Sequence, residues 1–329
     1  MKRIVITGAT GFLGGALAQQ LLARGDDVVA LARATSRTDA LERLGASVHR
    51  AELTDASSLQ PALDGAEVIV HAAGGGFSSG GIQSLYRSNR DTTAALVQAA
   101  RDCGFRGRFV LVSSVAAQGP SPDGQPLPSD RPPAPRSHYG RAKAEAEALV
   151  LADENAFAGT VLRPPTIHGP GDDRLLPLFR AIQRIGVATL PRPAMGSSWI
   201  HVADCADAIV RLADTDHDER AVFGVADGPP RAWPQVIATI GTALGRKART
   251  IRIPVPVLHG AATAAEWMGR LRSRPVLFTR DKVSDMQQAW WVSCPLALES
   301  AIGWQSRQDF DSAIHAMAQS WRDAGQLRD

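Results

Sequence analysis

The sequence predicts an α/β fold in which a doubly wound parallel sheet is followed by a smaller, mostly helical C-terminal region. Two observations support this prediction. Up to about residue 228, short β-branched runs alternate with helical patterns, and the connections between them are short. Beyond that point, helical patterns follow one another without intervening buried strands. The chain has 329 residues, of which 44% are hydrophobic, and this is ample for a buried core.

The strand-like runs are short, rich in β-branched residues and bounded by turn-forming residues. They are RIVITG (3–8), DVVALAR (27–33), SVHRAEL (47–53), EVIVHAAG (67–74), RFVLVSS (108–114) and TVLRPP (160–165). Helical patterns lie between them at FLGGALAQQLLARG (12–25), SSLQPALDG (57–65) and SLYRSNRDTTAALVQAARDCG (84–104). Because parallel strands need crossover helices, this order predicts one sheet with helices on both faces.

A proline-rich segment then interrupts the alternation. Seven of the 21 prolines lie between Gly119 and Arg136, which predicts a loop. A helix opens at Tyr139 in YGRAKAEAEALVLA, and a strand followed by a helix is expected in SSWIHVADCADAIVRLAD (197–214). The remaining helical patterns are LLPLFRAIQRIG (175–186), WPQVIATIGTALG (233–245), VLHGAATAAEWMGRL (257–271) and DFDSAIHAMAQSWRDAG (309–325).

Composition narrows the class of protein. The net charge is +3, and no dense run of lysine and arginine with interleaved aromatics occurs, so nucleic acid is not favoured as a partner. The three cysteines, Cys103, Cys205 and Cys294, lie far apart, so we expect no disulfide framework, no metal site and a cytoplasmic location. The N-terminal apolar run is only four residues long, and no segment reaches the roughly 18 apolar residues of a spanning helix. We therefore expect no stable membrane insertion.

A glycine-rich loop joins the first strand to the first helix. In TGATGFLG, Gly8, Gly11 and Gly14 lie three residues apart. Glycines allow a pyrophosphate to approach the backbone, and a helix N-terminus offers it unpaired N–H groups. This predicts a Rossmann-type dinucleotide loop with contacts from Gly8, Thr10, Gly11, Phe12, Leu13 and Gly14. The alternative is a tight strand–helix turn that binds no ligand.

The loop suggests a division of the chain. We assign residues 1–168 to a dinucleotide-binding domain, to which residues 198–226 return. Residues 169–197 and 227–329 form the expected substrate-binding region.

The end of the second strand bears on the choice between NAD and NADP. An NAD site usually has Asp or Glu there, bonded to the ribose hydroxyls, but this strand ends at Arg33, with Arg37 shortly after. Arginine attracts a 2′-phosphate, whereas a carboxylate repels it. The sequence therefore favours NADP(H). In the alternative, NAD(H) binds and Arg33 stacks on its adenine or is a solvated charge.

Tyr139 and Lys143, in YGRAK, lie four residues apart and so share one helix face. An ammonium beside a phenol favours the phenolate, so we expect the pKa of Tyr139 to lie below its usual value of about 10. Such a phenol exchanges a proton with a carbinol or carbonyl oxygen. A serine at the end of a neighbouring strand, in SSVAAQGP (113–120), can hold that oxygen. YxxxK also occurs by chance on surface helices, but Tyr86 and Tyr139 are the chain's only tyrosines.

Taken in order, six motifs resemble those of the extended short-chain dehydrogenase/reductase family, which includes NAD(P)-dependent epimerases and dehydratases. They are TGATGFLG, HAAG, SSVAAQGP, YGRAK, LRPPTIHGPG and WIHVADCADAI, and they cover roughly residues 1 to 230. The resemblance implies that Ser114, five residues before Gly119, is the catalytic serine, and we expect Ser113 to face the other way. The chain departs from the family at Gln118, where tyrosine is usual.

The resemblance also implies contacts with the cofactor. Lys143 would bind the nicotinamide ribose, and residues 164–167 would pack by the carboxamide. The full set of expected cofactor contacts beyond the glycine loop is Arg33, Arg37, Leu53, Ala72, Ala73, Gly74, Tyr139, Lys143, Pro164, Thr166 and Ile167. Relatives often associate through a pair of helices, so the resemblance further implies a homodimer.

Several other polar residues are expected to be structural. Asn89 is interpreted as an amide that bonds backbone groups, and Asp204 as a helix cap. His71, His168 and His201 have no metal-ligand spacing and are interpreted as hydrogen-bonded residues near strand ends.

The substrate side favours an apolar compound over a nucleotide sugar. Relatives that act on nucleotide-diphosphate sugars carry an arginine where this chain has Ser197, and bidentate arginine suits a diphosphate. Arg174 and Arg192 are the nearby residues that can substitute for it.

The tail supplies aromatic and apolar residues: Trp267, Met268, Trp290 and Trp291. They suit an apolar pocket, but the core of the small domain or a dimer contact explains them equally well, and a membrane-facing surface ranks third. RPVLFTRDKVSDM (274–286) and AIGWQSR (301–307) resemble the 3β-hydroxysteroid dehydrogenase-like branch, which implies a steroid-like, aryl or long-chain substrate.

Three functions remain open. The leading hypothesis is an NADP(H)-dependent oxidoreductase that interconverts a ketone and a secondary alcohol on a hydrophobic substrate. The alternative enzyme is a nucleotide-sugar epimerase or dehydratase with tightly bound NAD. A non-enzymatic nucleotide-binding scaffold ranks last, because both Tyr139 and Lys143 are present.

Overall fold

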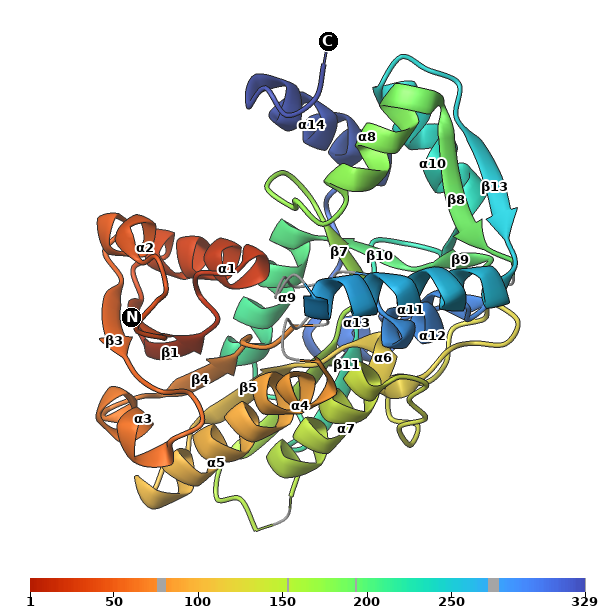
Figure 1. Ribbon diagram of the computed structural model, residues 1–329. Helices are drawn as coiled ribbons and strands as arrows, with labels where there is room; N and C mark the ends of the chain where they lie inside the picture. The colour runs from red at the N-terminus through yellow and green to blue at the C-terminus, as the bar shows by residue number, and fades with distance from the viewer. Residues whose placement is uncertain (76–80, 153, 193, 272–277, 329) are drawn as a thin grey trace.

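The computed structural model describes residues 1–75, 81–152, 154–192, 194–271 and 278–328. Its centre is a seven-stranded, wholly parallel sheet in the order β11-β6-β5-β4-β1-β2-β3 (Figure 1). The strands are β1 (Arg3–Thr7), β2 (Asp27–Ala32), β3 (Ser47–Arg50), β4 (Val68–His71), β5 (Arg108–Val112), β6 (Ala158–Arg163) and β11 (Ala221–Gly224). The predicted fold class is confirmed.

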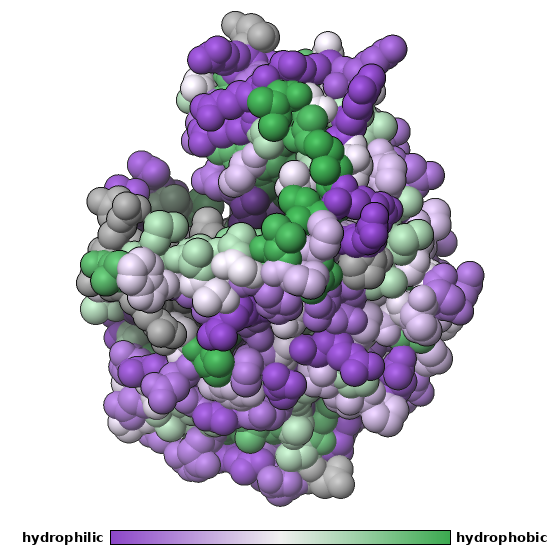
Figure 2. Space-filling view, turned by 45° about the vertical axis from the view of Figure 1, so that its right-hand side comes forward, coloured by the Kyte–Doolittle hydropathy of each residue, from purple (hydrophilic) through white to green (hydrophobic). Residues whose placement is uncertain are grey.

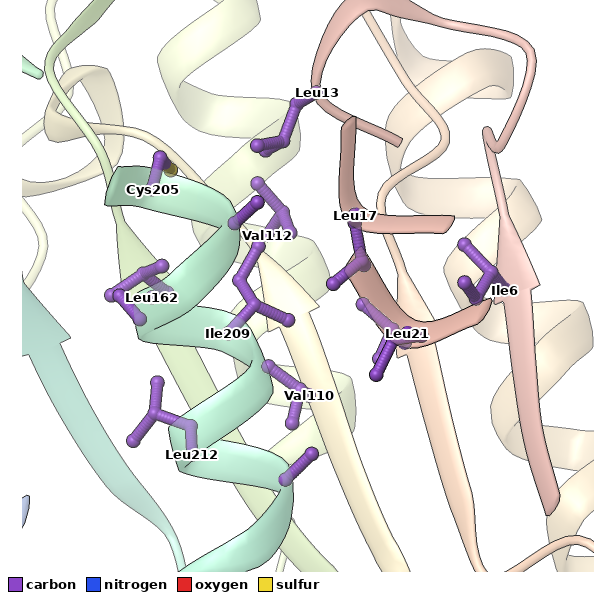
Figure 3. Close-up of a cluster of buried hydrophobic side chains, with 14 of the residues drawn as sticks. Ile6, Leu13, Leu17, Leu21, Val110, Val112, Leu162, Cys205, Ile209 and Leu212 are labelled. Atoms are coloured by element: carbon purple, nitrogen blue, oxygen red, sulfur yellow. The ribbon is translucent and has the colours of Figure 1, made fainter. Parts of the chain in front are cut away.

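Helices cover both faces of this sheet, because its inner strands, such as β1 and β5, are buried on both sides. One face carries α1 (Phe12–Ala23), α2 (Asp39–Arg43) and α9 (Val202–Asp214), and the other carries α3 (Ala56–Leu63), α5 (Thr92–Asp102) and α7 (His138–Val150). Figure 3 shows Leu17 and Leu21 of α1 and Ile209 of α9 gathered against Val110 and Val112 of β5. The two apolar layers hold the sheet rigidly, and its carboxyl ends form one continuous edge.

The predicted helix over residues 84–104 is divided in the structure. It comprises α4 (Gly81–Tyr86), a π-helical turn (Arg87–Asp91) and α5. Within the turn, the Asn89 amide donates to the carbonyl of Leu85 at 2.8 Å and to that of Gly75 at 3.1 Å. A side chain that bonds local carbonyls in this way disturbs the regular ladder, as π-turns commonly do.

Three small sheets lie outside the main sheet, and the C-terminal elements around them are here called the C-terminal body. These sheets pair β7 (Thr166–His168) with β10 (Trp199–His201), β8 (Val187–Pro191) with β13 (Arg249–Ile253), and β9 (Gly196–Ser197) with both β12 (Arg231–Ala232) and β14 (Trp290–Trp291). The helices of the chain that have not yet been named are α6 (Val115–Gln118), α8 (Leu176–Ile185), α10 (Trp233–Ala243), α11 (Val255–Leu271), α12 (Arg280–Met286), α13 (Leu296–Ile302) and α14 (Phe310–Asp323).

A separate apolar cluster unites α8, α10 and α14. The rings of Phe179 and Trp321 meet edge to face with centroids 4.8 Å apart, and Trp199 and Phe310 close the cluster toward the sheet. The helical character expected after residue 228 is confirmed, while β13 is a half-exposed strand that the sequence pattern did not reveal. The division into two domains stays a prediction. Of the stretch 274–286, residues 274–277 lie outside the described residues.

Candidate functional site

The expected site residues follow the strands of the main sheet and therefore meet at one edge. Gly8 follows β1, Arg33 follows β2, Leu53 lies just beyond β3, Ala72 follows β4, and Ser114 and Pro164 lie just beyond β5 and β6. The chain crosses over between β1 and β4, since β2 and β3 lie on one side and β4, β5 and β6 on the other. In open parallel sheets this crossover point is where ligands bind.

The glycine loop is close-packed where glycine is required. Gly8 has a φ of +76°, and a Cβ built on it lies 2.7 Å from backbone atoms of Ala72 and Ala73. A Cβ on Gly14 lies 2.1 Å from the carbonyl oxygen of Gly8. The loop is thus held against the end of β4, and a side chain at either position forces it away.

The N-terminus of α1 is open to an anion. Gly11 precedes the helix in an extended conformation, no side chain caps its N–H groups, and its first turn holds no acidic residue. Thr10 and Gly11 are exposed, Phe12 is half-buried and Leu13 is buried. Free N–H groups and the positive end of the helix dipole fit a pyrophosphate.

The end of β2 presents positive charge. Arg33 and Arg37 are exposed, and neither side chain forms a hydrogen bond or ion pair with the residues the structure describes. Leu53 is half-buried and packs onto the core cluster under α3 and α5.

The end of β4 lies beside the lysine of YGRAK. A Cβ on Gly74 lies 2.5 Å from the Asn89 Oδ1 and 3.1 Å from the Lys143 Nζ. The amide of Ala73 donates to the hydroxyl of Thr7 at 3.2 Å. These contacts place residues 72–74 between the glycine loop and Lys143.

The two serines of SSVAAQGP point in opposite directions. The Ser114 hydroxyl accepts a hydrogen bond from the amide of Ala116 at 3.1 Å, so it caps α6, and it also bonds the hydroxyl of Tyr139. The Ser113 hydroxyl donates to the carboxylate of buried Glu147. The expected reversal of Ser113 is confirmed, because neighbours at the end of a strand face opposite ways.

Tyr139 departs from the sequence-based expectation. Its pKa is raised above the ordinary value, chiefly because burial disfavours the phenolate. The hydrogen bond with Ser114 and the charge of Arg174 lower its pKa, whereas the charge of Asp285 raises it. The prediction that Lys143 lowers the pKa of Tyr139 is wrong for this structure, since Lys143 is not among the groups that shift that pKa.

Lys143 bonds a backbone carbonyl at the end of β5. The residue is 5% exposed, and its ammonium donates to the carbonyl of Val112, the last residue of β5, at 2.9 Å. Burial lowers the pKa of Lys143 to about 8, and the negative charge of Glu147 opposes this. The ammonium is thus desolvated and held beside Gly74 at the edge of the sheet.

A buried ion pair beneath the site was missed from the sequence. Arg163, the last residue of β6, pairs with Glu147 through Nη2–Oε2 at 2.7 Å and Nε–Oε1 at 2.9 Å, and both side chains are 2% exposed. The Arg163 Nη1 also donates to the carbonyl of Ser129 at 2.7 Å. The pair ties β6, α7 and the proline-rich loop together. The available signal was Glu147 following Lys143 by one helical turn on the buried face of α7.

The other polar residues are mostly structural, as expected. Asn89 is buried and bonds backbone groups, and His71 bonds Thr7 and Thr93 through its two ring nitrogens. Burial lowers the pKa of His71 to about 3, so its ring is neutral. His168 contacts Asp227 at 3.0 Å.

One expectation about a helix cap is wrong. His201, not Asp204, caps α9, because its Nδ1 accepts from the amide of Ala203 at 3.2 Å. Asp204 lies inside the first turn, and its Oδ2 accepts from the backbone amides of Arg307 and Gln308, which fixes the C-terminal segment onto α9.

Beyond β6, Thr166 and Ile167 are half-buried in β7, while Pro164 is buried and accepts a hydrogen bond from the amide of Val115. Ser197 is buried, and its hydroxyl bonds the backbone of Ser198 at 2.9 Å. The guanidinium of Arg174 lies over the ring of Phe12 and is paired with Asp172 at 2.6 Å. That of Arg231, across the small sheet from Ser197, is paired with Asp227 at 2.6 Å.

The tail aromatics differ in their surroundings. Trp267 and Met268 are 63% and 44% exposed on α11, whereas the ring of Trp290 packs against Gly124 and Gly196. Figure 2 shows hydrophobic side chains reaching the surface on the C-terminal body, above a largely hydrophilic face. Large exposed apolar residues in this part of the chain include Ile185, Met195, Ile251, Val257 and Leu271.

Among the residues that the structure describes, no group of three or more His, Cys, Asp or Glu side chains is placed to hold a metal ion. In the same part of the chain, no helix is long and apolar enough to cross a membrane.

Comparison with known proteins agrees with this geometry. Residues 4–226 match the model of the NAD dependent epimerase/dehydratase family. Ceramide reductase of Caulobacter vibrioides is 30% identical over 297 residues, which is 89% of this chain and 87% of that protein. UDP-glucose 4-epimerase of Vibrio cholerae is 25% identical over 98% of this chain and 96% of its own. The crystal structure of gox2253 superposes with a TM-score of 0.81 at 22% identity, covering all of both chains. The chain belongs to the NAD dependent epimerase/dehydratase family, whose members bind an NAD(P) cofactor.

Proposed function

We propose that this protein is an NADP(H)-dependent oxidoreductase that interconverts a ketone and a secondary alcohol on a hydrophobic substrate. The observation that carries the proposal is that Ser114 bonds Tyr139 just beyond the end of β5, while Lys143 holds its ammonium at the end of the same strand beside Gly74. The glycine loop is close-packed at Gly8 and Gly14, where a Cβ would clash with the backbone, and the N-terminus of α1 has no side-chain cap. Both features fit a bound dinucleotide.

In the proposed reaction, Tyr139 passes a proton to the carbonyl oxygen during reduction and takes it back during oxidation. When bound, the nicotinamide supplies or accepts the hydride. Ser114 donates its hydroxyl hydrogen to the same oxygen and sets its position. Burial keeps the phenol of Tyr139 protonated, which is the state that reduction needs. Lys143, tethered at Val112, contributes its ammonium to the nicotinamide ribose.

The choice of NADP(H) rests on Arg33 and Arg37. Both are exposed at the end of β2, where no carboxylate stands to bond the ribose hydroxyls of NAD. Free guanidinium groups suit a 2′-phosphate.

A nucleotide-sugar epimerase with tightly bound NAD is the second candidate, favoured by the relative from Vibrio cholerae. The ion pairs of the nearby arginines argue against a nucleotide-sugar substrate. Ser197 stands where a clamp for the diphosphate is expected, and Arg174 and Arg231 are already paired with Asp172 and Asp227. Arg192 is exposed and is the remaining candidate for a clamp.

The choice of a hydrophobic substrate is supported by the absence of that clamp and by the relative that is named a ceramide reductase. The placement in a 3β-hydroxysteroid dehydrogenase-like branch and the homodimer belong to the same proposal. A nucleotide-binding scaffold is disfavoured, because scaffolds have no need of the arrangement of Ser114, Tyr139 and Lys143.

The test begins with fluorescence titration of the purified protein with NADPH and NADH. A panel of steroid, aryl and long-chain ketones follows, with turnover read from NADPH absorbance. Consumption of NADPH with at least one ketone supports the proposal. Turnover of a nucleotide sugar with co-purified NAD and no net redox change overturns it in favour of the epimerase.

A further inference from the structure

Arg50 lies directly beside the end of β2, although it is 17 residues from Arg33 in sequence. It is the last residue of β3, and its Cα partner across the sheet is Ala32, the last residue of β2. Arg50 therefore lies at the edge of the sheet where the chain leaves β2 and enters the loop of residues 33–38.

The Arg50 guanidinium holds that loop from inside. Its Nη1 donates to the carbonyls of Arg33 at 3.3 Å, Ala34 at 3.0 Å and Ser36 at 3.3 Å. Its Nη2 donates to the hydroxyl of Thr38 at 2.9 Å. Four acceptors spread over residues 33–38 thus converge on one planar group, a geometry that lysine cannot reproduce.

The same region carries unbalanced positive charge. Arg33, Arg37 and Arg50 are all exposed, and none of them forms an ion pair with the described residues. The nearby acid Glu42 accepts from the hydroxyl of Thr38 at 2.7 Å, so it braces the loop rather than an arginine. Three guanidinium groups without a carboxylate favour an anion among them.

We propose that Arg50 is a positioning residue for cofactor choice: it fixes the backbone from which Arg33 and Arg37 reach a 2′-phosphate. The inference rests on the proposed use of NADP(H). A loop that is ordered before binding loses less freedom when the phosphate arrives, so the gain appears in affinity for NADPH and not for NADH. Arg50 is exposed and buries no apolar surface, so the fold does not depend on it.

The test compares wild type with Arg50→Met and Arg50→Lys, and uses Arg43→Met as a control. Arg43 is exposed on the adjacent α2. Its replacement by Met removes one positive charge, as the Arg50→Met change does, but it leaves the hydrogen bonds to residues 33–38 in place. Each protein is titrated with NADPH and NADH by fluorescence, and hydrogen exchange of residues 33–38 is measured without cofactor. We expect both Arg50 variants to raise the Kd for NADPH about tenfold, to leave that for NADH within about twofold, and to lose protection in the loop. Arg43→Met should leave all three readouts unchanged.

Other outcomes separate the two proposals. If wild type prefers NADPH but Arg50→Lys retains that preference, charge alone suffices and the positioning role is overturned while NADP(H) use stands. Unchanged loop protection in Arg50→Met overturns it as well. If wild type binds NADPH and NADH equally, both the cofactor choice and the role of Arg50 fall. Arg33→Met should weaken NADPH binding with loop protection intact, which distinguishes a phosphate contact from a residue that positions it.

Discussion

The ammonium of Lys143 donates a hydrogen bond to the carbonyl oxygen of Val112 at 2.9 Å, which fixes a cation at the end of β5. Lys143 is not among the groups that shift the pKa of Tyr139, one helical turn away. The bond also places the cation beside Gly74, where the proposed nicotinamide ribose would lie. The predictions below follow from this arrangement and from the buried groups around it.

Removal of the Tyr139 hydroxyl should abolish turnover without unfolding the protein. We expect Tyr139→Phe to lower kcat at least about a hundredfold, because the proton has no other donor at that oxygen. The Kd for NADPH should change less than about twofold, since the ring remains. Steady-state kinetics and fluorescence titration measure the two effects. Turnover within tenfold of wild type contradicts the assignment of Tyr139.

The adjacent serines provide a matched comparison. Ser114→Ala should lower kcat/KM strongly and also cost about 1 kcal/mol of stability, because its hydroxyl caps α6. Ser113→Ala should cost about 1–2 kcal/mol through the lost bond to Glu147 while leaving kcat nearly unchanged. Kinetics and urea denaturation of both variants check the contrast. Equal loss of turnover in the two variants means that orientation does not separate their roles.

The pKa of Lys143 predicts an unusual dependence of stability on pH. It falls from 10.5 to about 8 on folding, which corresponds to about 3 kcal/mol. Between pH 8 and 10.5 the unfolded state binds the extra proton, so the contribution of Lys143 to stability rises with pH in that window. Below pH 8 the cost of the buried ammonium is present in full. Burial of Tyr139 has the opposite effect above pH 10. Because the pKa of Tyr139 is raised by folding, the unfolded state loses the phenol proton first, and the contribution of Tyr139 to stability falls as pH rises.

The variant Lys143→Met isolates this effect, because Tyr139 is common to both proteins. At pH 7 we expect Lys143→Met to be more stable than wild type, and the difference should shrink as pH rises toward 10. Urea denaturation of the cofactor-free proteins at pH 7, 8.5 and 9.5 provides the measurement. A difference independent of pH means that Lys143 does not lose its proton in the folded state.

The ion pair of Glu147 and Arg163 should be a large contributor to stability when only one partner is removed. Glu147→Gln leaves a guanidinium buried without its carboxylate, and we expect a loss of about 3–5 kcal/mol. Glu145→Gln is the matched control, since Glu145 lies on the exposed side of α7 and pairs with Arg90 at 3.3 Å. That surface pair should contribute less than about 1 kcal/mol. Comparable losses in the two variants exclude a special role for the buried pair.

Local patterns in the sequence predicted six of the seven strands of the main sheet, the glycine loop and the opposite directions of Ser113 and Ser114, because each depends on near neighbours. The edge strand β11 was missed, since it is only four residues long and half of it is only partly buried. The predicted direction of the Tyr139 pKa was wrong because that pKa depends chiefly on burial, and further on charges from distant parts of the chain, Asp285 and Arg174. The pairing of Glu147 with Arg163 and of Arg50 with the loop at 33–38 joins separate elements, so no spacing rule reveals it. The strand β13 was missed because none of its residues is fully buried, so it shows no apolar run. The strand β8 is mostly buried, but it ends at Pro191, a residue that argues against a strand.

The glycine loop provides a last contrast between neighbouring residues. A Cβ at position 14 lies 2.1 Å from the carbonyl oxygen of Gly8, whereas one at position 15 lies 3.5 Å from its nearest neighbour, the carbonyl oxygen of Ala9. Gly14→Ala must therefore displace the backbone that would hold the pyrophosphate, at a cost of about 3 kcal/mol. Gly15→Ala adds a methyl group in ordinary van der Waals contact within a helix and should stabilise the protein by about 0.5–1 kcal/mol. We expect Gly14→Ala to weaken NADPH and NADH binding equally, because the pyrophosphate is common to both, and Gly15→Ala to weaken neither. Fluorescence titration at a temperature where both variants remain folded decides the outcome, and full cofactor affinity in Gly14→Ala excludes this loop as the binding site.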